Sequence, residues 1–182
     1  MEKKNTNDGL GYEISGDEPL ISMQQEALNR QPKRLCMFFC AEDKAGLERI
    51  DHFINQVDKS EVRLSVVIDF PGKKFPEGYD FPDFYWLGNK DFNLLGKKKP
   101  ALLQWLANRK FDLLISFVKS ERKRYRKLIE AVQAELKTGP VVSSDTQLVD
   151  VSIAWENGQM DYGRYYEQIE YYLEQLKIKI NR

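Results

Sequence analysis

Apolar residues recur along the chain in two alternating patterns, one typical of buried strands and the other of helices that bury one stripe. The stretch KRLCMFFC is apolar at every position from Leu35 to Cys40, which predicts a central parallel strand with both faces buried. The next apolar residues recur every three or four positions, as on one side of a helix: Leu47, Ile50, Phe53, Ile54 and Val57. A helix is therefore predicted to follow the strand directly.

The alternation continues to the C-terminal end of the chain. Further strands are predicted in VRLSVVID from Val62, DFYWL from Asp83, FDLLISF from Phe111, GPVVSS from Gly139 and LVDVSIAW from Leu148. Helices are predicted to begin at Pro100, to run from Glu121 to Lys137, and to run from about Arg164 to Lys177. We therefore predict an α/β fold, a three-layer α/β/α sandwich with a mostly parallel, Rossmann-like sheet of five to six strands.

Length and charge bound the organisation of the chain. A chain of 182 residues with 42% apolar residues can bury one sizeable core, so we expect residues 33–182 to form a single α/β domain. Residues 1–18 are expected to be a mobile tail, and residues 19–32 a short helix or linker. The 28 basic and 28 acidic residues balance, which disfavours nucleic acid or an anionic membrane as a partner. No run reaches the roughly 20 apolar residues of a membrane span, so we expect a cytoplasmic protein.

Both cysteines lie on the first predicted strand. Cys36 and Cys40 point to the same face but stand about 13 Å apart along a strand, whereas a disulfide needs Cα atoms within roughly 7 Å. One histidine and two separated thiols cannot form a closed metal site without several carboxylates. We expect two buried, free thiols in a reduced compartment, and no bound metal.

The turn after the first strand lacks the features of a phosphate cradle. Such a cradle needs glycines and a helix N-terminus without negative charge, but here Ala41, Glu42 and Asp43 form the turn. Asp43 is better interpreted as an N-cap. Neither the dinucleotide-binding fingerprint nor a Walker loop occurs in the sequence, so no cofactor is predicted.

No residue is predicted to be catalytic. His52 is the only histidine and falls on the solvent side of its helix, away from the strand ends where triad nucleophiles work. The carboxylate pairs Glu42/Asp43 and Asp145/Asp150 could do acid and base work, but surface carboxylates are far commoner than catalytic pairs. The sequence therefore favours binding over catalysis.

Two segments carry features that the fold does not require. Phe70 to Phe92 holds eight aromatic residues and three prolines, which indicates either a strap whose rings close the core, the interpretation we favour, or a recognition loop. Basic residues crowd the start of the helix after FDLLISF, at Arg122, Lys123, Arg124, Arg126 and Lys127. They oppose the helix dipole by about 0.3 to 1 kcal/mol per exposed charge. An anion would explain them, although such runs are more often solvated faces.

Any ligand of an open parallel sheet is expected beyond the carboxyl ends of the strands, where neighbouring connections leave toward opposite faces. The first and fourth predicted strands are the expected neighbours there. Because the loop after the first strand is acidic, an anion should prefer the loops after the fourth and fifth strands. The predicted ligand-binding residues are Lys119, Ser120, Arg122, Ser143 and Ser144.

Four stretches carry a resemblance to known proteins: LCMFFCAEDKAGLERIDHFI, KDFNLLGKKKP, KFDLLISF and YYEQIEYYLEQL. Over roughly Lys33 to Leu176 the chain resembles a family of small bacterial α/β proteins known only as a domain of unknown function, which has no established catalytic residues. KFDLLISF with the following helix and KTGPVV is distantly similar to the acceptor half of heptosyltransferase-type glycosyltransferases. Those enzymes need a second Rossmann-like half, and an acidic residue often stands where this chain has Ser116.

Together these features favour a non-enzymatic cytoplasmic domain that binds a protein partner, which includes a second copy of itself, or a small phosphate-like anion. The alternative is a stand-alone half of a glycosyltransferase-like fold that binds a sugar phosphate or nucleotide.

Overall fold

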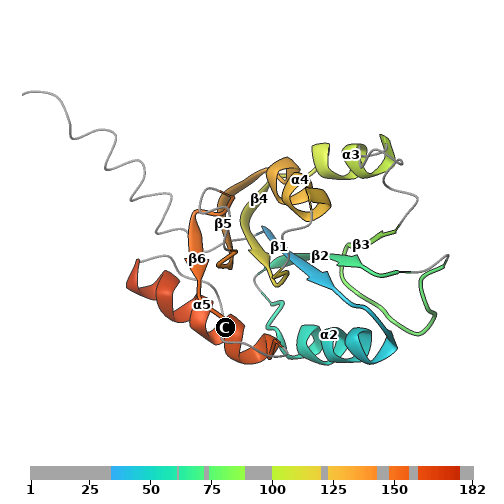
Figure 1. Ribbon diagram of the computed structural model, residues 1–182, viewed down its shortest axis with the longest axis horizontal. Coiled ribbons are helices and arrows are strands. Elements are labelled where there is room, and N and C mark those ends of the chain that lie inside the picture. The colour runs from blue at the N-terminus through green and yellow to red at the C-terminus, as the bar shows by residue number, and fades with distance from the viewer. Residues whose placement is uncertain are drawn as a thin grey trace, which may run out of the picture.

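The protein is built on one six-stranded sheet in which every strand pair is parallel (Figure 1). The computed structural model describes residues 34–60, 62–71, 74–88, 100–119, 123–142, 148–155 and 160–176. The strands are β1 (Arg34–Cys40), β2 (Arg63–Asp69), β3 (Phe84–Leu87), β4 (Phe111–Ser116), β5 (Ala134–Pro140) and β6 (Val151–Ile153). Their order in space is β3-β2-β1-β4-β5-β6. The predicted α/β fold with a parallel, Rossmann-like sheet is confirmed.

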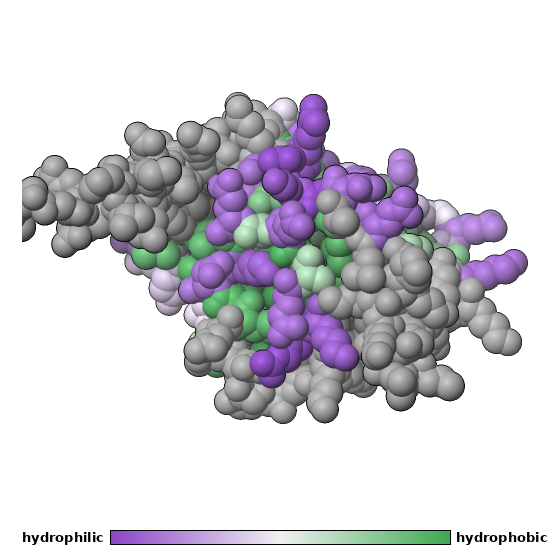
Figure 2. Space-filling view, turned by 90° about the horizontal axis from the view of Figure 1, so that it is seen from above, coloured by the Kyte–Doolittle hydropathy of each residue, from purple (hydrophilic) through white to green (hydrophobic). Residues whose placement is uncertain are grey.

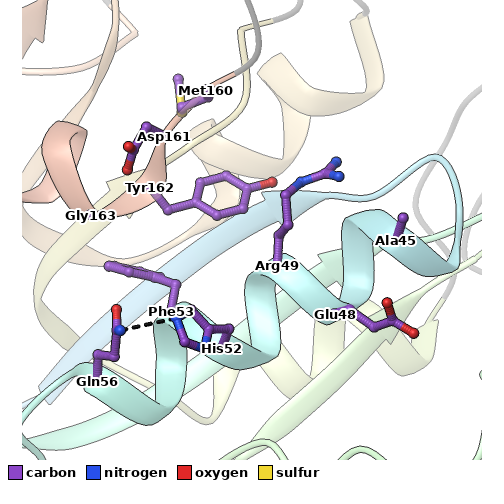
Figure 3. A pocket seen from close by; sticks show the side chains of 10 residues that line it. All are labelled: Ala45, Glu48, Arg49, His52, Phe53, Gln56, Met160, Asp161, Tyr162 and Gly163. Atoms are coloured by element: carbon purple, nitrogen blue, oxygen red, sulfur yellow. Dashed lines mark hydrogen bonds between the residues drawn. The ribbon is translucent and has the colours of Figure 1, made fainter.

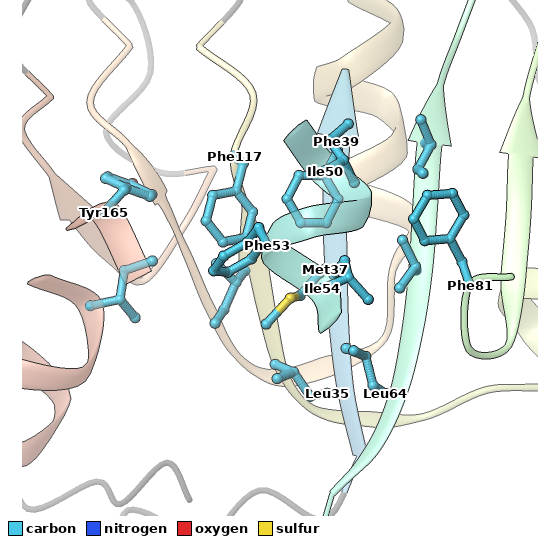
Figure 4. Packing of buried hydrophobic residues seen from close by; sticks show 14 of the residues in the cluster. Leu35, Met37, Phe39, Ile50, Phe53, Ile54, Leu64, Phe81, Phe117 and Tyr165 are labelled. Carbon is cyan, nitrogen blue, oxygen red and sulfur yellow. The ribbon is translucent and has the colours of Figure 1, made fainter. Parts of the chain in front are cut away.

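Helices cover both faces of the sheet (Figure 1). On one face α2 (Lys44–Gln56) and α5 (Tyr162–Gln175) pack against Leu35, Met37 and Phe39 of β1 (Figure 4). On the other face α3 (Pro100–Ala107) and α4 (Lys123–Ala131) pack against Cys36 and Phe38. Alternate side chains of β1 thus enter two separate cores, which is why the strand is apolar throughout and confirms its predicted central place.

The start of α2 follows from its capping residue. Asp43 has an extended backbone, and its carboxylate accepts a hydrogen bond from the Gly46 N–H at 2.7 Å, as an N-cap does. One buried stripe then faces the sheet: Gly46, Leu47, Ile50, Phe53 and Ile54. The predicted N-cap and helix are both confirmed.

The helix predicted from Glu121 to Lys137 is wrong at its C-terminal end. The helix α4 ends at Ala131, and residues from Ala134 onward form β5, with Leu113 of β4 paired to Leu136. Val132 and Leu136 continue the helical spacing, but pairing with β4 and β6 satisfies the backbone of this segment instead. Lys137 reaches back and donates to the Ile129 carbonyl at 2.7 Å, which satisfies one free carbonyl at the helix end.

Gly139, expected to stop that helix and begin the next strand, lies inside β5. A Cβ at this position would stand 3.3 Å from the Ser116 Cβ of β4. The glycine therefore permits close approach of the two strands where they end.

The C-terminal helix is confirmed, but one side of its predicted buried stripe is exposed. Tyr165, Ile169 and Leu173 are fully buried, whereas Tyr172 and Leu176 are about half exposed, at 48% and 50%. The sheet ends at the short strand β6 next to this helix, so only the residues that face the sheet find a core to enter.

The described part of the aromatic segment is a strap. Phe75 contacts the rings of Phe70, Tyr79, Phe81, Phe84 and Trp86, at centroid distances of 4.7 to 6.3 Å. Phe81 is 6% exposed and belongs to the α2 face of the core (Figure 4). The rings therefore close the outer end of the sheet beside β3, as the favoured interpretation predicted, while Phe92 lies outside the described residues.

A polar cluster ties the amino edge of the sheet together. Asp83, which precedes β3 with a φ of 37°, accepts hydrogen bonds from Arg109 Nε at 2.9 Å and Nη2 at 2.6 Å. Ser65 of β2 donates to the same carboxylate, and the Arg109 guanidinium lies 4.2 Å from the centre of the Trp105 ring. We call Ser65, Asp83, Trp105 and Arg109 the amino-edge cluster. It joins β2, the start of β3 and the turn between α3 and β4.

The expected tail and short helix, residues 1–18 and 19–32, lie outside the described residues. Within the described part of the chain, no helix is both long and apolar enough to cross a membrane.

Candidate functional site at the carboxyl edge

Between β1 and β4 the connections that follow the strands lead to opposite faces of the sheet. These strands are neighbours, as predicted, and pair from Leu35 with Leu113 to Phe38 with Ser116. The connection from β1 leads to α2 on one face, whereas the connection from β4 leads to α4 on the other. This is the topological switch point at which open α/β sheets bind ligands.

Aromatic rings fill the α2 side of this switch point. Phe39 near the end of β1 stacks on Phe117, directly after β4, with ring centroids 4.6 Å apart. Tyr162 of α5 stands edge-on to both rings, at 5.3 and 5.6 Å. On this side, the described floor of the carboxyl edge is therefore packed core.

Lys119 is the described member of the predicted anion site. It lies three residues beyond the end of β4, its side chain is exposed, and its ammonium group donates to the Trp155 carbonyl at 3.3 Å. The lysine thus spans from the end of β4 to the end of β6. The other predicted residues, Ser120, Arg122, Ser143 and Ser144, lie outside the described residues, so the complete site stays a prediction.

Two buried polar atoms lie in the same corner. Within the described part of the chain, Trp155 Nε1 and the Tyr165 hydroxyl have no hydrogen-bond partner, and their rings meet at 87° with centroids 5.5 Å apart. Tyr165 is fully buried, and this burial raises the pKa of its hydroxyl, which stays protonated. Unpaired buried donors are costly and rare, so this corner is chemically unusual.

Groups of the loop after β1 already form hydrogen bonds within the fold. The Ala41 N–H donates to the Asp69 carbonyl at 2.9 Å, and the Asp43 carboxylate caps α2. Cys40, expected to be buried, is only half-buried, and its sulfur lies 3.2 Å from the Tyr125 hydroxyl. Cys36 is fully buried, as predicted, and neither cysteine forms a disulfide.

A pocket of about 730 Å³ opens between α2 and the start of α5 (Figure 3). Its α2 wall is one helical stripe: Ala45, Glu48, Arg49, His52, Phe53 and Gln56. Its α5 wall is formed by residues 160–163, among which the Tyr162 ring reaches toward the Arg49 guanidinium (Figure 3). The volume lies within the range of small-molecule sites.

His52 is exposed on α2, as predicted, and it also lines this pocket. The Gln56 amide nitrogen lies 3.0 Å from His52 Nε2, as the dashed line in Figure 3 shows. This contact holds the His52 ring beside the Gln56 amide, one turn later on α2.

The sequence pattern did not single out Arg49, Tyr162 or Asp69. Asp69 is 3% exposed at the carboxyl end of β2, in register with Cys40. The sequence did contain a signal for Asp69, because an acidic residue at the end of a buried apolar strand is uncommon. Arg49 and Tyr162 gave no such signal, since only packing of α5 beside α2 brings them together.

The basic segment is partly a solvated face. Arg126 and Glu130 are exposed and paired, with Arg126 Nε 3.2 Å from Glu130 Oε1, while Tyr125, Leu128 and Ile129 face the sheet. Figure 2 looks down on the α3 and α4 side of Figure 1, and hydrophilic side chains cover much of the described surface there. Among the described residues, no group of three or more His, Cys, Asp or Glu side chains is placed to hold a metal ion.

The fold and its carboxyl edge define the class of this protein, an open α/β domain wound on both faces of a parallel sheet, with a switch point between β1 and β4. The chain belongs to a family of unknown function, DUF6913, which matches residues 19–176. No curated protein and no solved structure matches the chain significantly.

Proposed function

We propose that the protein is a cytoplasmic binding domain, not an enzyme, that takes a small phosphate-like anion at the carboxyl edge of its sheet. The observation that carries this proposal is the exposed Lys119 ammonium beside the β1/β4 switch point. Ser120, Arg122, Ser143 and Ser144 join it by their sequence positions, which follow the ends of β4 and β5. Two cysteines that are not joined in a disulfide suit a reducing compartment.

The chemistry of the edge favours binding over turnover. Asp43, one of the two carboxylates in the loop after β1, already accepts a helix N–H. A general base must be free to take a proton from a substrate. Lysine and serine side chains supply charge and hydrogen bonds to an anion without such a base.

The test is a thermal-shift titration with inorganic phosphate, pyrophosphate and ADP, because a ligand that binds the folded state raises the unfolding midpoint. We expect a concentration-dependent rise that weakens with added salt. The double variant Lys119→Ala, Arg122→Ala should lose most of this rise.

The matched control is the double variant Lys59→Ala, Lys110→Ala. It removes the same charge from two exposed lysines that precede β2 and β4, at the opposite edge of the sheet. Equal anion binding by both double variants would exclude the Lys119 site. Glycosyl or phosphoryl transfer by the purified chain would overturn the assignment as a non-enzyme.

A further inference from the structure

The pocket between α2 and α5 has a polar end and an apolar body. At the polar end, the Arg49 guanidinium and the Tyr162 hydroxyl extend toward each other (Figure 3). A guanidinium carries five N–H donors in a fixed fork, so it can serve protein and ligand partners together. Toward the other end of the helical stripe, His52 adds a ring N–H and Gln56 an amide.

Tyr162 is held as a hydrogen-bond donor. Burial raises the pKa of its hydroxyl above the ordinary value, although the positive charge of Arg49 opposes this effect. The hydroxyl is therefore protonated at neutral pH and can donate to an acceptor in the pocket.

The two carboxylates that line the pocket are engaged by neighbours of their own. Glu48 lies 3.8 Å from the Lys44 ammonium, one turn earlier on α2. Asp161 caps α5 by accepting from the Arg164 N–H at 3.1 Å, and its other oxygen lies 3.8 Å from Arg164 Nε. Each carboxylate thus has a cation beside it, which reduces its repulsion of an anion.

The apolar body is formed by ring and thioether surface. Phe53 and Tyr162 lie with ring centroids 5.9 Å apart, and Met160 adds its thioether to the lining. Flat apolar groups pack well against such surfaces. The pocket therefore suits a ligand with a flat apolar part next to a charged head.

From these contacts we infer that the α2–α5 pocket binds a small organic anion, whose carboxylate or phosphate monoester is held by Arg49 and Tyr162 and whose apolar part lies against Phe53 and Met160. This site does not depend on Lys119. It would give the domain a ligand of defined shape, in addition to the phosphate-like anion proposed above.

The chain has a built-in reporter for this site. His52 is the only histidine in the sequence and lines the pocket, so its ring proton signals in an NMR spectrum need no assignment. Benzoate and phenyl phosphate are titrated at fixed pH. Benzyl alcohol, which has the ring but no charge, and acetate, which has the charge but no ring, serve as control ligands. We expect saturable shifts with at least one aromatic anion, at an affinity about tenfold or more above both control ligands.

Two variants separate recognition from nonspecific effects. Arg49→Gln removes the charged fork from an exposed helix position, and Ala45→Trp places a bulky ring in the pocket one turn before Arg49; each should weaken binding of the aromatic anion about tenfold or more. Arg63→Gln, an exposed arginine at the start of β2, is the charge-matched control and should bind as the parent does.

The titrations test the head group, the independence of the two sites and the inference itself. The tighter of the two aromatic anions identifies the head group, and retained binding in the Lys119→Ala, Arg122→Ala variant shows that the two sites are separate. Absence of saturable shifts with either aromatic anion overturns the inference. Benzyl alcohol that binds as tightly as benzoate, or unchanged affinity in both pocket variants, overturns it as well.

Discussion

The two edges of the sheet use polar groups in opposite ways. At the amino edge, the Asp83 carboxylate takes hydrogen bonds from Ser65 and twice from Arg109, and Arg109 also stacks on Trp105. At the carboxyl edge, the described polar groups include an exposed Lys119, the buried and unpartnered Tyr165 hydroxyl, and a pocket lined by Arg49.

This difference separates structural chemistry from chemistry that is available to a ligand. A carboxylate already held by an arginine fork and a serine has little capacity left for a ligand, so the amino-edge cluster stabilises the fold. Polar groups that are exposed beyond the strand ends, or that line a pocket, can also contact a ligand. The floor beneath them, however, is packed aromatic core.

The largest effect is expected from Phe117→Ala, which removes part of that floor. Phe117 is 5% exposed and its ring contacts Phe39, Phe53 and Tyr162, so the change should lower the free energy of unfolding by about 3–5 kcal/mol in urea. Tyr171→Ala, at a residue 58% exposed on α5, should change it by about 0.5 kcal/mol or less. A small loss for Phe117→Ala would mean that the floor is not packed.

A smaller effect is expected from Asp83→Asn in the amino-edge cluster. Asparagine tolerates the positive φ at this position, so the substitution removes the charge without adding backbone strain. We expect a loss of about 1–2 kcal/mol, because the Arg109 bonds are charge-assisted but partly exposed. Glu130→Gln, which breaks the exposed pair with Arg126, should cost only about 0.3–0.5 kcal/mol. Equal losses would remove the distinction between the cluster and an ordinary surface pair.

The same residue should make stability depend on pH. Hydrogen bonds from Arg109 lower the pKa of the Asp83 carboxyl in the folded protein below its ordinary value of 3.8, against the opposing effect of burial. Its contribution is therefore complete above the ordinary value and is lost as the pH falls through the lower, folded value. Urea unfolding between pH 7 and pH 3 should show a smaller difference between the parent and Asp83→Asn at the acid end.

The last prediction concerns the reaction rates of the two thiols, which lie at different positions along β1, and it involves no change in the free energy of unfolding. Burial raises the pKa of the Cys36 thiol, so it should resist a thiol-reactive reagent until the protein unfolds, whereas half-buried Cys40 at the carboxyl edge should react first. Single Cys36→Ala and Cys40→Ala variants assign the two rates. Equal native rates would contradict the burial of Cys36.

Much of the fold could be predicted because buried apolar residues recur along the sequence with the period of a strand or a helix. Leu35 to Cys40 is apolar throughout since both faces of β1 meet a core, and Asp43 marks the start of α2 through its own side chain. The end of α4 could not be predicted in this way. Val132 and Leu136 keep a helical spacing, and only pairing with Leu113 of β4 makes Leu136 part of a strand.

The two candidate sites also differ in whether a local sequence pattern could locate their residues. The position of Lys119 beyond the carboxyl end of β4 was predictable, because it follows a strand that is apolar on both faces. The α2–α5 pocket was not, because Arg49 and Tyr162 are far apart in sequence and neither lies in a motif.

The sequence by itself therefore determined which segments are buried and the parallel arrangement that alternating strands and helices impose. The tertiary structure alone decided which side chains meet one another: the Phe39, Phe117 and Tyr162 floor, the Asp83 and Arg109 pair, and the pocket beside His52. The physical reason is that apolar periodicity records how deeply a residue is buried, but carries no information about which distant residue buries it.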